Sequence, residues 1–289
     1  MAIVLDGKKV RDEIKKELRE KIGGFSGKPK LAIIQIGNNK ESAAYVRQKK
    51  LFAESIGALA EHIQLSADVQ LAEVLKTVER FNKDTDTHGI LLQLPIPETL
   101  DSDVIIEAIL PGKDVDGLGS VNVKLLWENK TTGFTPATTK GILSLLHYYK
   151  IPVAGKRVVV VGRSFLVGKP TAIALLNADA TVTVAHSKTV NCSEVTRSAD
   201  ILIIAAGKPH FIQKDDVREG QIVIDVGITA VTGEKLNDEV AEVTITGDVH
   251  FDDVKDIVGA ISPVPGGVGP MTVASLFQNL VSAYERQNS

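Results

Sequence analysis

A turn that carries Gly162 and Gly168 follows an apolar, β-branched run at 158–161 and leads into a helix-like segment at 171–177. Glycine lets a backbone approach a ligand closely, and a helix N-terminus offers free N–H groups and a positive dipole end to an anion. This order of strand, turn and helix is typical of a dinucleotide phosphate site. Ser164 replaces the second glycine of the G-x-G-x-x-G fingerprint and the next glycine comes one position late, so the turn alone fits an ordinary loop equally well.

The residues after the next apolar run, 180–185, indicate which dinucleotide this turn would bind. A domain that prefers NAD places Asp or Glu about 20 residues past the glycine turn, where it accepts a hydrogen bond from the ribose 2′-hydroxyl. Here the chain has His186, Ser187 and Lys188, with Arg163 in the turn. Two cations, a hydroxyl and no carboxylate suit a 2′-phosphate, so we expect NADP. The competing interpretation is a loop end without any ligand.

A lysine is the most unusual residue in the first half of the chain. Tyr45, Lys49, Phe52 and Ile56 share one face of an expected helix at about 42–56, because they are spaced four, three and four residues apart. The other members of this face are apolar or aromatic. Lys49 therefore either extends along the apolar surface to reach water or is held in place for a chemical purpose.

Other candidate residues lie at a strand end and in turns. Gln93 stands near the end of an apolar strand at 89–94, where open α/β sheets place their ligands. Asp114 and Asp116 lie in a Pro-Gly-Lys-Asp-Val-Asp-Gly segment that also fits a turn with solvated carboxylates. The remaining ligand spacing of a calcium loop is absent, and we expect no metal site. The stretch 263–272 has too much proline and glycine for a flexible linker.

The elements that must position these residues alternate between helix and strand. After a charged helix at 8–22, the pattern predicts strand, helix, strand, helix and strand at 31–36, 42–56, 60–65, 71–82 and 89–94. This order predicts a parallel sheet with helices on its faces, complete before the glycine turn, and therefore a separate first domain. A helix from Thr138 to about Tyr149 leads to the second half. Strands are expected there at 158–161, 180–185, 201–205, 221–225 and 242–246.

Composition excludes several classes of protein. The 289 residues are 44% hydrophobic and 24% charged, which suits one large or two ordinary domains. A net charge of −3 and a pI of about 6.1 give no sign of nucleic-acid binding. The single cysteine, Cys192, excludes a disulfide framework within the chain and suits a reducing compartment. No apolar run approaches the roughly 18 residues of a membrane span and no signal peptide is evident, so we expect a cytoplasmic protein.

Taken together, these segments resemble the bifunctional methylenetetrahydrofolate dehydrogenase/cyclohydrolase family, from about residue 3 to the last helix. The motifs that carry the resemblance are Ser42-x-x-Tyr45-x-x-x-Lys49, Gly89-Ile-Leu-Leu-Gln93-Leu-Pro95, Lys113-Asp-Val-Asp116-Gly117, Gly162-Arg-Ser-x-x-Val-Gly168-x-Pro170, Thr181-Val-Thr-Val-Ala-His186-Ser187 and Pro263 to Thr272. One segment departs from the family. The usual Pro-Cys-Thr-Pro-x-Gly is here Pro136-Ala-Thr138-Thr139-Lys-Gly141, which puts the local loop geometry in doubt but removes no catalytic group.

The resemblance implies an α/β enzyme with two domains and a cleft between them. Residues 1–140 with 270–289 would form the folate-binding catalytic domain, and 141–269 a Rossmann-type NADP-binding domain. Family members are commonly homodimers through the Rossmann domains. Hydride would pass from 5,10-methylenetetrahydrofolate to NADP⁺, and water would then open the methenyl cation to 10-formyltetrahydrofolate.

The resemblance also assigns roles to single residues. Lys49 would handle protons, with its pKa lowered by burial, and Gln93 would hold it in position. Asp116 would accept hydrogen bonds from the pterin, and Tyr45 would stack on the folate. These four would be the catalytic group, and the substrate would also meet Pro265, Gly266, Gly267 and Thr272. The residues implied for NADP are Gly162, Arg163, Ser164, Gly168, Pro170, His186, Ser187, Gly207, Gly227 and Ile228.

Three alternatives stay open at this point. A monofunctional member of the same family would lack the hydrolase, against which Lys49 argues. A shikimate-type NADP dehydrogenase also combines a catalytic α/β domain with a lysine, but Gln93-Leu-Pro and the 263–272 loop argue against it. A dinucleotide-sensing regulator normally brings a basic DNA-binding module, and none is visible.

Overall fold

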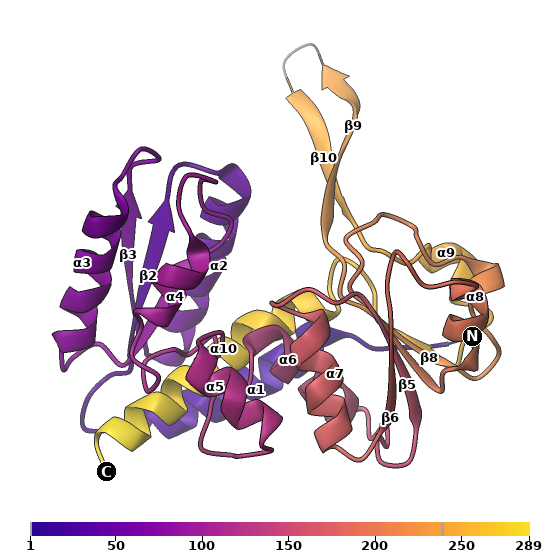
Figure 1. Ribbon diagram of the computed structural model, residues 1–289, viewed down its shortest axis with the longest axis horizontal. Coiled ribbons are helices and arrows are strands. Elements are labelled where there is room, and N and C mark those ends of the chain that lie inside the picture. Colours follow the sequence, from indigo (N-terminus) through magenta and orange to yellow (C-terminus); the bar gives the residue numbers. More distant parts are fainter. Residues whose placement is uncertain (1, 238–239) are drawn as a thin grey trace. The chain divides into compact units, whose positions relative to one another are not determined.

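Three parallel strands in the order β3-β2-β4 form the sheet predicted for the first half of the chain (Figure 1). They are β2 (Lys30–Ile36), β3 (Leu59–Leu65) and β4 (Gly89–Gln93). Successive residues of a strand point to opposite faces, and the even-numbered positions of β2 pack against α3 (Leu71–Lys83) and α4 (Ser102–Glu107). α2 (Lys40–Ile56) lies on the other side of the sheet (Figure 1). The odd-numbered positions of β2, which include Gln35, therefore face α2.

The structure is a computed structural model that describes residues 2–237 and 240–289. Contacts divide the chain into two units. We name them the small-sheet unit, Asp12–Ala137 with Val273–Ser289, and the large-sheet unit, Met1–Arg11 with Thr138–Thr272. Further helices are α1 (Gly7–Gly23), α5 (Ser120–Trp127), α6 (Ala137–Tyr148) and α10 (Val268–Gln287). Helix α5 lies within the small-sheet unit, whereas a unit boundary falls inside each of the other three helices.

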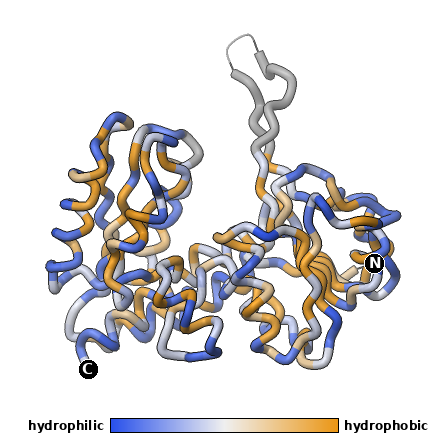
Figure 2. Tube along the Cα trace, viewed as in Figure 1, coloured by the Kyte–Doolittle hydropathy of each residue, from blue (hydrophilic) through white to orange (hydrophobic). Residues whose placement is uncertain are grey.

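The large-sheet unit holds a six-stranded parallel sheet in the order β1-β11-β8-β7-β5-β6. Its strands are β1 (Ile3–Val4), β5 (Arg157–Val161), β6 (Thr181–Ala185), β7 (Ile201–Ile204), β8 (Ile222–Asp225) and β11 (Ala260–Ile261). The helices between them are α7 (Gly168–Asn177), α8 (Cys192–Ser198), the 3₁₀ turn η1 (Lys214–Asp216) and α9 (Phe251–Val254). The central strands are strongly apolar (Figure 2), as expected when both faces of a parallel sheet are covered.

After β1 at the far edge, the chain enters the centre of this sheet at β5, goes to β6 on one side and then crosses to β7 on the other. The order reverses between β5 and β7. Ligands of doubly wound sheets bind outside the carboxyl ends of the strands at such a reversal. The turn after β5, which carries Gly162, and the segment after β7, which carries Gly207, both lie at this position.

The structure corrects one strand of the sequence analysis. The run 242–246 was expected to continue the parallel pattern, but it belongs to β10 (Val240–Thr246), which pairs antiparallel with β9 (Thr229–Asn237). This hairpin extends away from the sheet of its own unit (Figure 1). The position beside β8 is taken by β11, which in turn pairs with β1. For that reason the first eleven residues group with the large-sheet unit, whereas the sequence analysis placed them in the N-terminal domain.

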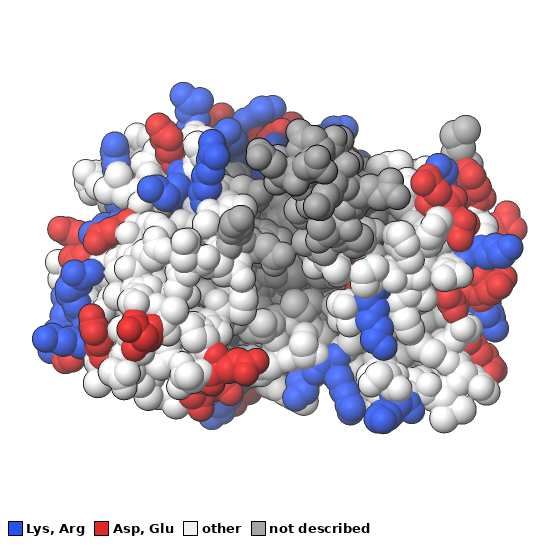
Figure 3. All heavy atoms as spheres, turned by 90° about the horizontal axis from the view of Figure 1, so that it is seen from above, with Lys and Arg blue, Asp and Glu red and all other residues white. Residues whose placement is uncertain are grey.

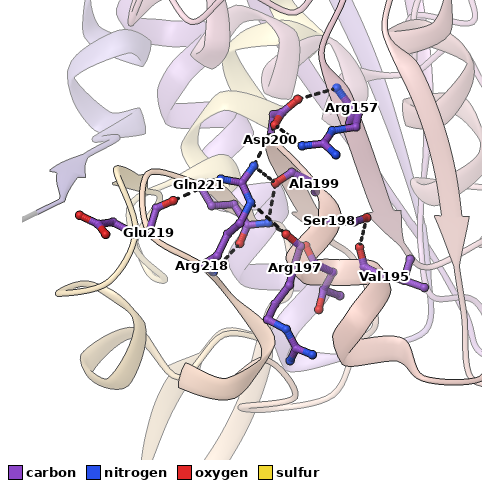
Figure 4. A network of polar contacts seen from close by, with 10 residues as sticks. Arg157, Val195, Arg197, Ser198, Ala199, Asp200, Arg218, Glu219 and Gln221 are labelled. Carbon is purple, nitrogen blue, oxygen red and sulfur yellow. Dashed lines mark hydrogen bonds and ion pairs between the residues drawn. The ribbon is translucent and has the colours of Figure 1, made fainter.

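A network of polar contacts ties the amino ends of β5, β7 and β8 together (Figure 4). Asp200 accepts hydrogen bonds from the backbone N–H of Arg157 at 3.0 Å and from the guanidinium groups of Arg157 and Arg218 at 3.2 and 2.8 Å. Gln221 donates to the carbonyls of Thr196 and Ala199. The hydrogen bonds from Arg157 lower the pKa of Asp200 to about 2. This network is at the strand ends opposite to the glycine turn, so we assign it a structural role.

Charges of both signs are interspersed on the face shown in Figure 3, in keeping with the net charge of −3. Among the residues that the structure describes, no helix has the length and apolar character needed to cross a membrane.

Candidate active site

Lys49 does not extend to water. Its side chain comes from α2, is 9% exposed, and donates a hydrogen bond from Nζ to Oε1 of Gln93 at 2.6 Å. Gln93 is the last residue of β4, and its Nε2 donates to the carbonyl of Leu94 at 2.7 Å, which fixes the amide with its oxygen toward Lys49. The Nζ atom also lies 5.9 Å from the centre of the Tyr45 ring. The structure thus brings together three of the residues that the sequence analysis singled out.

Asp116 completes this group electrostatically. Burial lowers the pKa of Lys49 to about 8, and the charge of Asp116 opposes that shift. Burial raises the pKa of Asp116 to about 6, and the charge of Lys49 opposes that shift in turn. The carboxylate also accepts a hydrogen bond from the backbone N–H of Ala137 at the start of α6. A lysine and a carboxyl group that both titrate near neutral pH form a pair suited to proton transfer.

Asp114 has a different role from Asp116. Its carboxylate accepts hydrogen bonds from the backbone N–H groups of Gly117 and Gly119, at 3.1 and 2.8 Å, and from Nδ2 of Asn122 at 2.9 Å. These contacts fold the turn that carries Asp116. Gly117 has φ +69°, and a Cβ there would lie 2.5 Å from the carbonyl oxygen of Phe134, so the turn needs glycine.

Two further side chains hold the same turn, and the sequence patterns assigned a role to neither. Lys113 donates from Nζ to the carbonyls of Phe81, Asn82 and Asp84 at the end of α3, at 2.7 to 3.0 Å. Asn279 in α10 donates from Nδ2 to the carbonyl of Val115 at 2.9 Å. Lys113 was visible as a motif residue, but Asn279 lies 164 positions from its partner and carried no sequence signal.

The glycine turn has the close approach that its composition indicates. Gly162 has φ +125°, and a Cβ there would collide with the carbonyl of Ala205, which follows β7. A Cβ at Gly168 would collide with the carbonyl of Gly162. Ser164 stands where the fingerprint has glycine because its Oγ accepts hydrogen bonds from the N–H groups of Val167 and Gly168, both at 3.3 Å. The serine closes the turn at the N-terminus of α7, whose first turn also contains Pro170.

Arg163 and Ser187 lie at neighbouring strand ends. β5 and β6 pair in register up to Val161 and Ala185, and the N–H of Gly162 donates to the carbonyl of Ala185 at 2.8 Å. Both side chains are exposed. His186, between them in the chain order, accepts at Nδ1 from the N–H of Lys188 at 3.2 Å. This arrangement places cationic and hydroxyl side chains where a ribose 2′ substituent of a bound dinucleotide would lie.

Two buried carboxyl groups order the loops around Gly207 and Gly227. Asp248 is fully buried and accepts from the N–H groups of Ala206, Gly207 and Lys208 at 2.7 to 2.9 Å. Asp225 accepts from the N–H groups of Gly227, Asp248 and Val249. Burial raises the pKa of Asp225 to about 7, and the charge of Asp248 adds to the shift. The sequence analysis missed this pair, although a carboxyl residue that ends a buried apolar run was a possible signal.

The remaining predicted residues also lie in the large-sheet unit. Gly266 accepts from the N–H of Gly7 and Gly267 donates to the carbonyl of Pro263, which holds the loop that contains Pro265. Thr272 donates to Thr138 Oγ1 at 3.3 Å, and Ile228 is 44% exposed. The unusual Thr139 is fully buried and shares a hydrogen bond with Thr171 at 3.0 Å, so a hydroxyl contact takes the place of the family's proline. No group of three or more His, Cys, Asp or Glu side chains suited to a metal ion occurs in the described part of the chain.

Comparison with known families assigns both halves of the chain to domains of one family. Residues 5–116 match the family described as tetrahydrofolate dehydrogenase/cyclohydrolase, catalytic domain, and residues 136–288 match the NAD(P)-binding domain of the same family. The chain belongs to the tetrahydrofolate dehydrogenase/cyclohydrolase family. The resemblance and the two-part α/β fold predicted from the sequence are thereby confirmed, and a shikimate-type dehydrogenase is disfavoured.

Individual members of the tetrahydrofolate dehydrogenase/cyclohydrolase family are similar along the whole chain. The bifunctional protein FolD of Methanoculleus marisnigri is 46% identical over 281 residues, which cover 97% of this chain and 96% of that protein. The structure of the bifunctional enzyme FolD from Campylobacter jejuni has a TM-score of 0.93 and 40% identity, with 99% of each chain covered. The Trypanosoma brucei N5,N10-methylenetetrahydrofolate dehydrogenase-cyclohydrolase, complexed with NADP cofactor and inhibitor, has a TM-score of 0.93 and 36% identity over 99% of this chain and 98% of that one.

Proposed function

We propose that this chain oxidises 5,10-methylenetetrahydrofolate with NADP⁺ and then hydrolyses the product to 10-formyltetrahydrofolate. The observation that carries the proposal is the buried Lys49–Gln93 contact with Asp116 beside it. A dehydrogenase alone has no need for a lysine that exchanges protons near neutral pH, whereas a hydrolase acting on a cation does. Family membership supports the same pair of reactions.

In the first step, a hydride leaves the one-carbon bridge of the folate with both electrons of its C–H bond. NADP⁺, when bound, accepts this hydride. The chain binds and orients the two partners. The N–H groups of the glycine turn and the start of α7 suit the pyrophosphate, and Arg163 and Ser187 suit the 2′-phosphate. Asp225 and Asp248 keep the loops at Gly207, Gly227 and Ile228 in place, and these loops would contact the cofactor when it is bound.

In the second step, a water oxygen bonds to the methenyl carbon and loses a proton. The adduct then gives up its hydroxyl proton as the carbon–oxygen double bond forms, the bond from that carbon to N5 breaks, and N5 takes up a proton, which leaves the formyl group on N10. Lys49 is placed to exchange these protons because its pKa of about 8 allows both forms near neutral pH. Gln93 holds the amine through its fixed amide oxygen.

The substrate is held by the other predicted residues. Above pH 6, Asp116 is largely ionised and accepts hydrogen bonds from the amino and ring N–H groups of the pterin. Tyr45 stacks against the folate. By the family resemblance, the loop with Pro265, Gly266 and Gly267, and Thr272 after it, would also contact the substrate. From the family resemblance we also propose a cytoplasmic homodimer formed through the large-sheet unit.

Replacing Lys49 tests the hydrolase. Lys49→Met should abolish methenyl hydrolysis, followed as loss of methenyl absorbance, while folate binding persists. Lys50→Met is the matched control, since Lys50 is the exposed neighbour on the same helix and should leave the rate unchanged. A normal hydrolysis rate in Lys49→Met would show that the assigned role is wrong.

Replacing Arg163 tests the choice of cofactor. Loss of one charge-assisted contact to a phosphate costs roughly 1.5–3 kcal/mol, so Arg163→Ala should raise the KM for NADP⁺ about 10- to 100-fold. The KM for NAD⁺ should change little. Lys214→Ala, an exposed cation of the same unit, serves as the control. Equal changes with both cofactors would remove the argument for 2′-phosphate recognition.

A further inference from the structure

A groove of about 610 Å³ lies between α2 and β3 in the small-sheet unit. β3 is the edge strand of its sheet, and its residues Ala60, His62 and Gln64 line the groove beside Gln35 of β2. Gln35 and Gln64 are register partners, so their side chains share one face of the sheet. The volume falls in the range of roughly 300–1,000 Å³ that is usual for small-molecule sites.

The groove is separate from the Lys49 face of α2. Arg47 and Lys50 line it from the helix, together with Leu51 and Glu54. At 3.6 residues per turn, Lys50 projects about 100° and Arg47 about 160° from the direction of Lys49. One helix therefore presents the catalytic amine on one side and this groove on another.

The charge of the lining is strongly biased. Three cations line the groove, Lys28, Arg47 and Lys50, against the single carboxylate of Glu54. In the described part of the chain, no salt bridge pairs any of the three cations. Burial lowers the pKa of His62, and the charge of Lys50 lowers it further, which shows that the positive charge is felt at the floor. Unpaired like charges around one cavity favour an anion that neutralises them.

Gln35 of β2 and His62 of β3 form the floor of the groove, and hydrogen bonds fix both side chains. Gln35 is 1% exposed, donates from Nε2 to the carbonyl of Gly37 at 3.3 Å, and meets Nε2 of His62 with its Oε1 at 3.0 Å. Since the amide nitrogen donates elsewhere, the amide oxygen accepts from the imidazole. The Nδ1 atom of the neutral His62 ring is then left as an acceptor, and an anion bound nearby would favour its protonation.

The groove also has an apolar part. Leu51 and Leu59 both line it and are 55% and 47% exposed. A purely inorganic anion would leave these side chains in water, whereas a hydrocarbon segment would cover them. We propose that the groove binds a small organic dianion, a metabolite with two carboxylates or a phosphate on a short carbon chain. Arg47, Lys50 and Lys28 hold its charges, and Leu51 and Leu59 contact its carbon chain.

Calorimetric titration of the full chain tests the proposal without any use of catalysis. The probes are glutarate and glycerol 3-phosphate, which distinguish the carboxylate from the phosphate form of the ligand, with all titrations at one ionic strength. At least one probe should bind with a Kd of about 1 mM or tighter. Arg47→Gln/Lys50→Gln should weaken that binding at least tenfold, since it removes two charge-assisted contacts.

The matched control is Lys76→Gln/Lys130→Gln, which removes two exposed cations of the same unit outside the groove. It should bind the probe as the wild type does. Both double variants should keep the basal dehydrogenase rate and the melting temperature of the wild type, because none of the four residues belongs to the catalytic group. The proposal is overturned if neither probe binds the wild type, if Arg47→Gln/Lys50→Gln binds normally, or if the control loses binding to the same extent.

Discussion

Removal of the Asp116 charge should lower the pKa of Lys49. Two opposing influences set that pKa at about 8: burial lowers it and the carboxylate of Asp116 raises it. Asp116→Asn keeps the shape of the side chain but removes the charge that stabilises the ammonium form. An opposite charge at close range shifts a pKa by about one to three pH units, and each unit equals about 1.4 kcal/mol. We therefore expect Lys49 in the variant to titrate between about pH 5 and 7.

The pH dependence of hydrolysis measures this shift. The kcat for methenyl hydrolysis at saturating substrate should show inflections near pH 8 and near pH 6 in the wild type, from Lys49 and Asp116. In Asp116→Asn the lower inflection of the carboxyl group should vanish and the lysine inflection should move down. An NMR titration of isotope-labelled lysine reports the same pKa without substrate, which separates it from weaker folate binding.

The control for this experiment is Asp103→Asn, an exposed carboxylate of the same unit with the same change in charge. Its lysine inflection should stay near pH 8. A Lys49 pKa that is unchanged or higher in Asp116→Asn would refute the electrostatic coupling, and with it the assignment of the two residues to one proton-handling pair.

Two further predictions concern stability. Asp200→Asn should lower the free energy of unfolding by about 1 kcal/mol, a value kept small because the site is partly solvated. The native pKa of Asp200 is about 2 and that of an unfolded aspartate about 4. The difference in free energy of unfolding between the wild type and the variant should therefore be complete above pH 4 and vanish as the pH falls toward 2. Urea unfolding at several pH values measures this difference, and a value independent of pH would contradict the argument. Gly117→Ala should lower the free energy of unfolding by about 2 kcal/mol more than Gly155→Ala does. Both glycines have positive φ, but only Gly117 has an atom within 4 Å of the added Cβ. Equal melting temperatures of the two variants would disprove the steric argument.

Residue patterns predicted most of the elements around the candidate active site. The spacing of Tyr45, Lys49 and Phe52 predicted the face of α2 that is now seen to be covered, and the apolar run before Gln93 predicted β4. Such patterns arise because a side chain repeats its direction every 3.6 residues in a helix and every two in a strand. The same periodicity did not predict the hairpin of β9 and β10, because the direction of side chains along a strand does not tell which strand is its partner.

The supporting contacts needed the tertiary structure. Lys49 and Gln93 are 44 residues apart, and no local pattern predicts that the lysine amine donates to an amide oxygen instead of reaching water. The sequence of the turn that carries Asp116 also fits solvated carboxylates, yet Asp114 and Asn122 hold it from within the same stretch and Asn279 holds it from the distant helix α10. The groove beside β3 was invisible in the sequence, because its cations are ordinary surface residues until α2 and the edge strand bring them together.

The sequence by itself determined the chemical groups of this protein and the faces of the elements that carry them. It supplied a lysine on an apolar helix face, an amide at a strand end, and a glycine turn followed by cations in place of a carboxylate. Only the tertiary structure decided the protonation behaviour of those groups. A pKa depends on burial and on charges that arrive from elsewhere in the chain, and the shifts of Lys49, Asp116 and Asp225 exist only once the sheets and helices have removed these side chains from water.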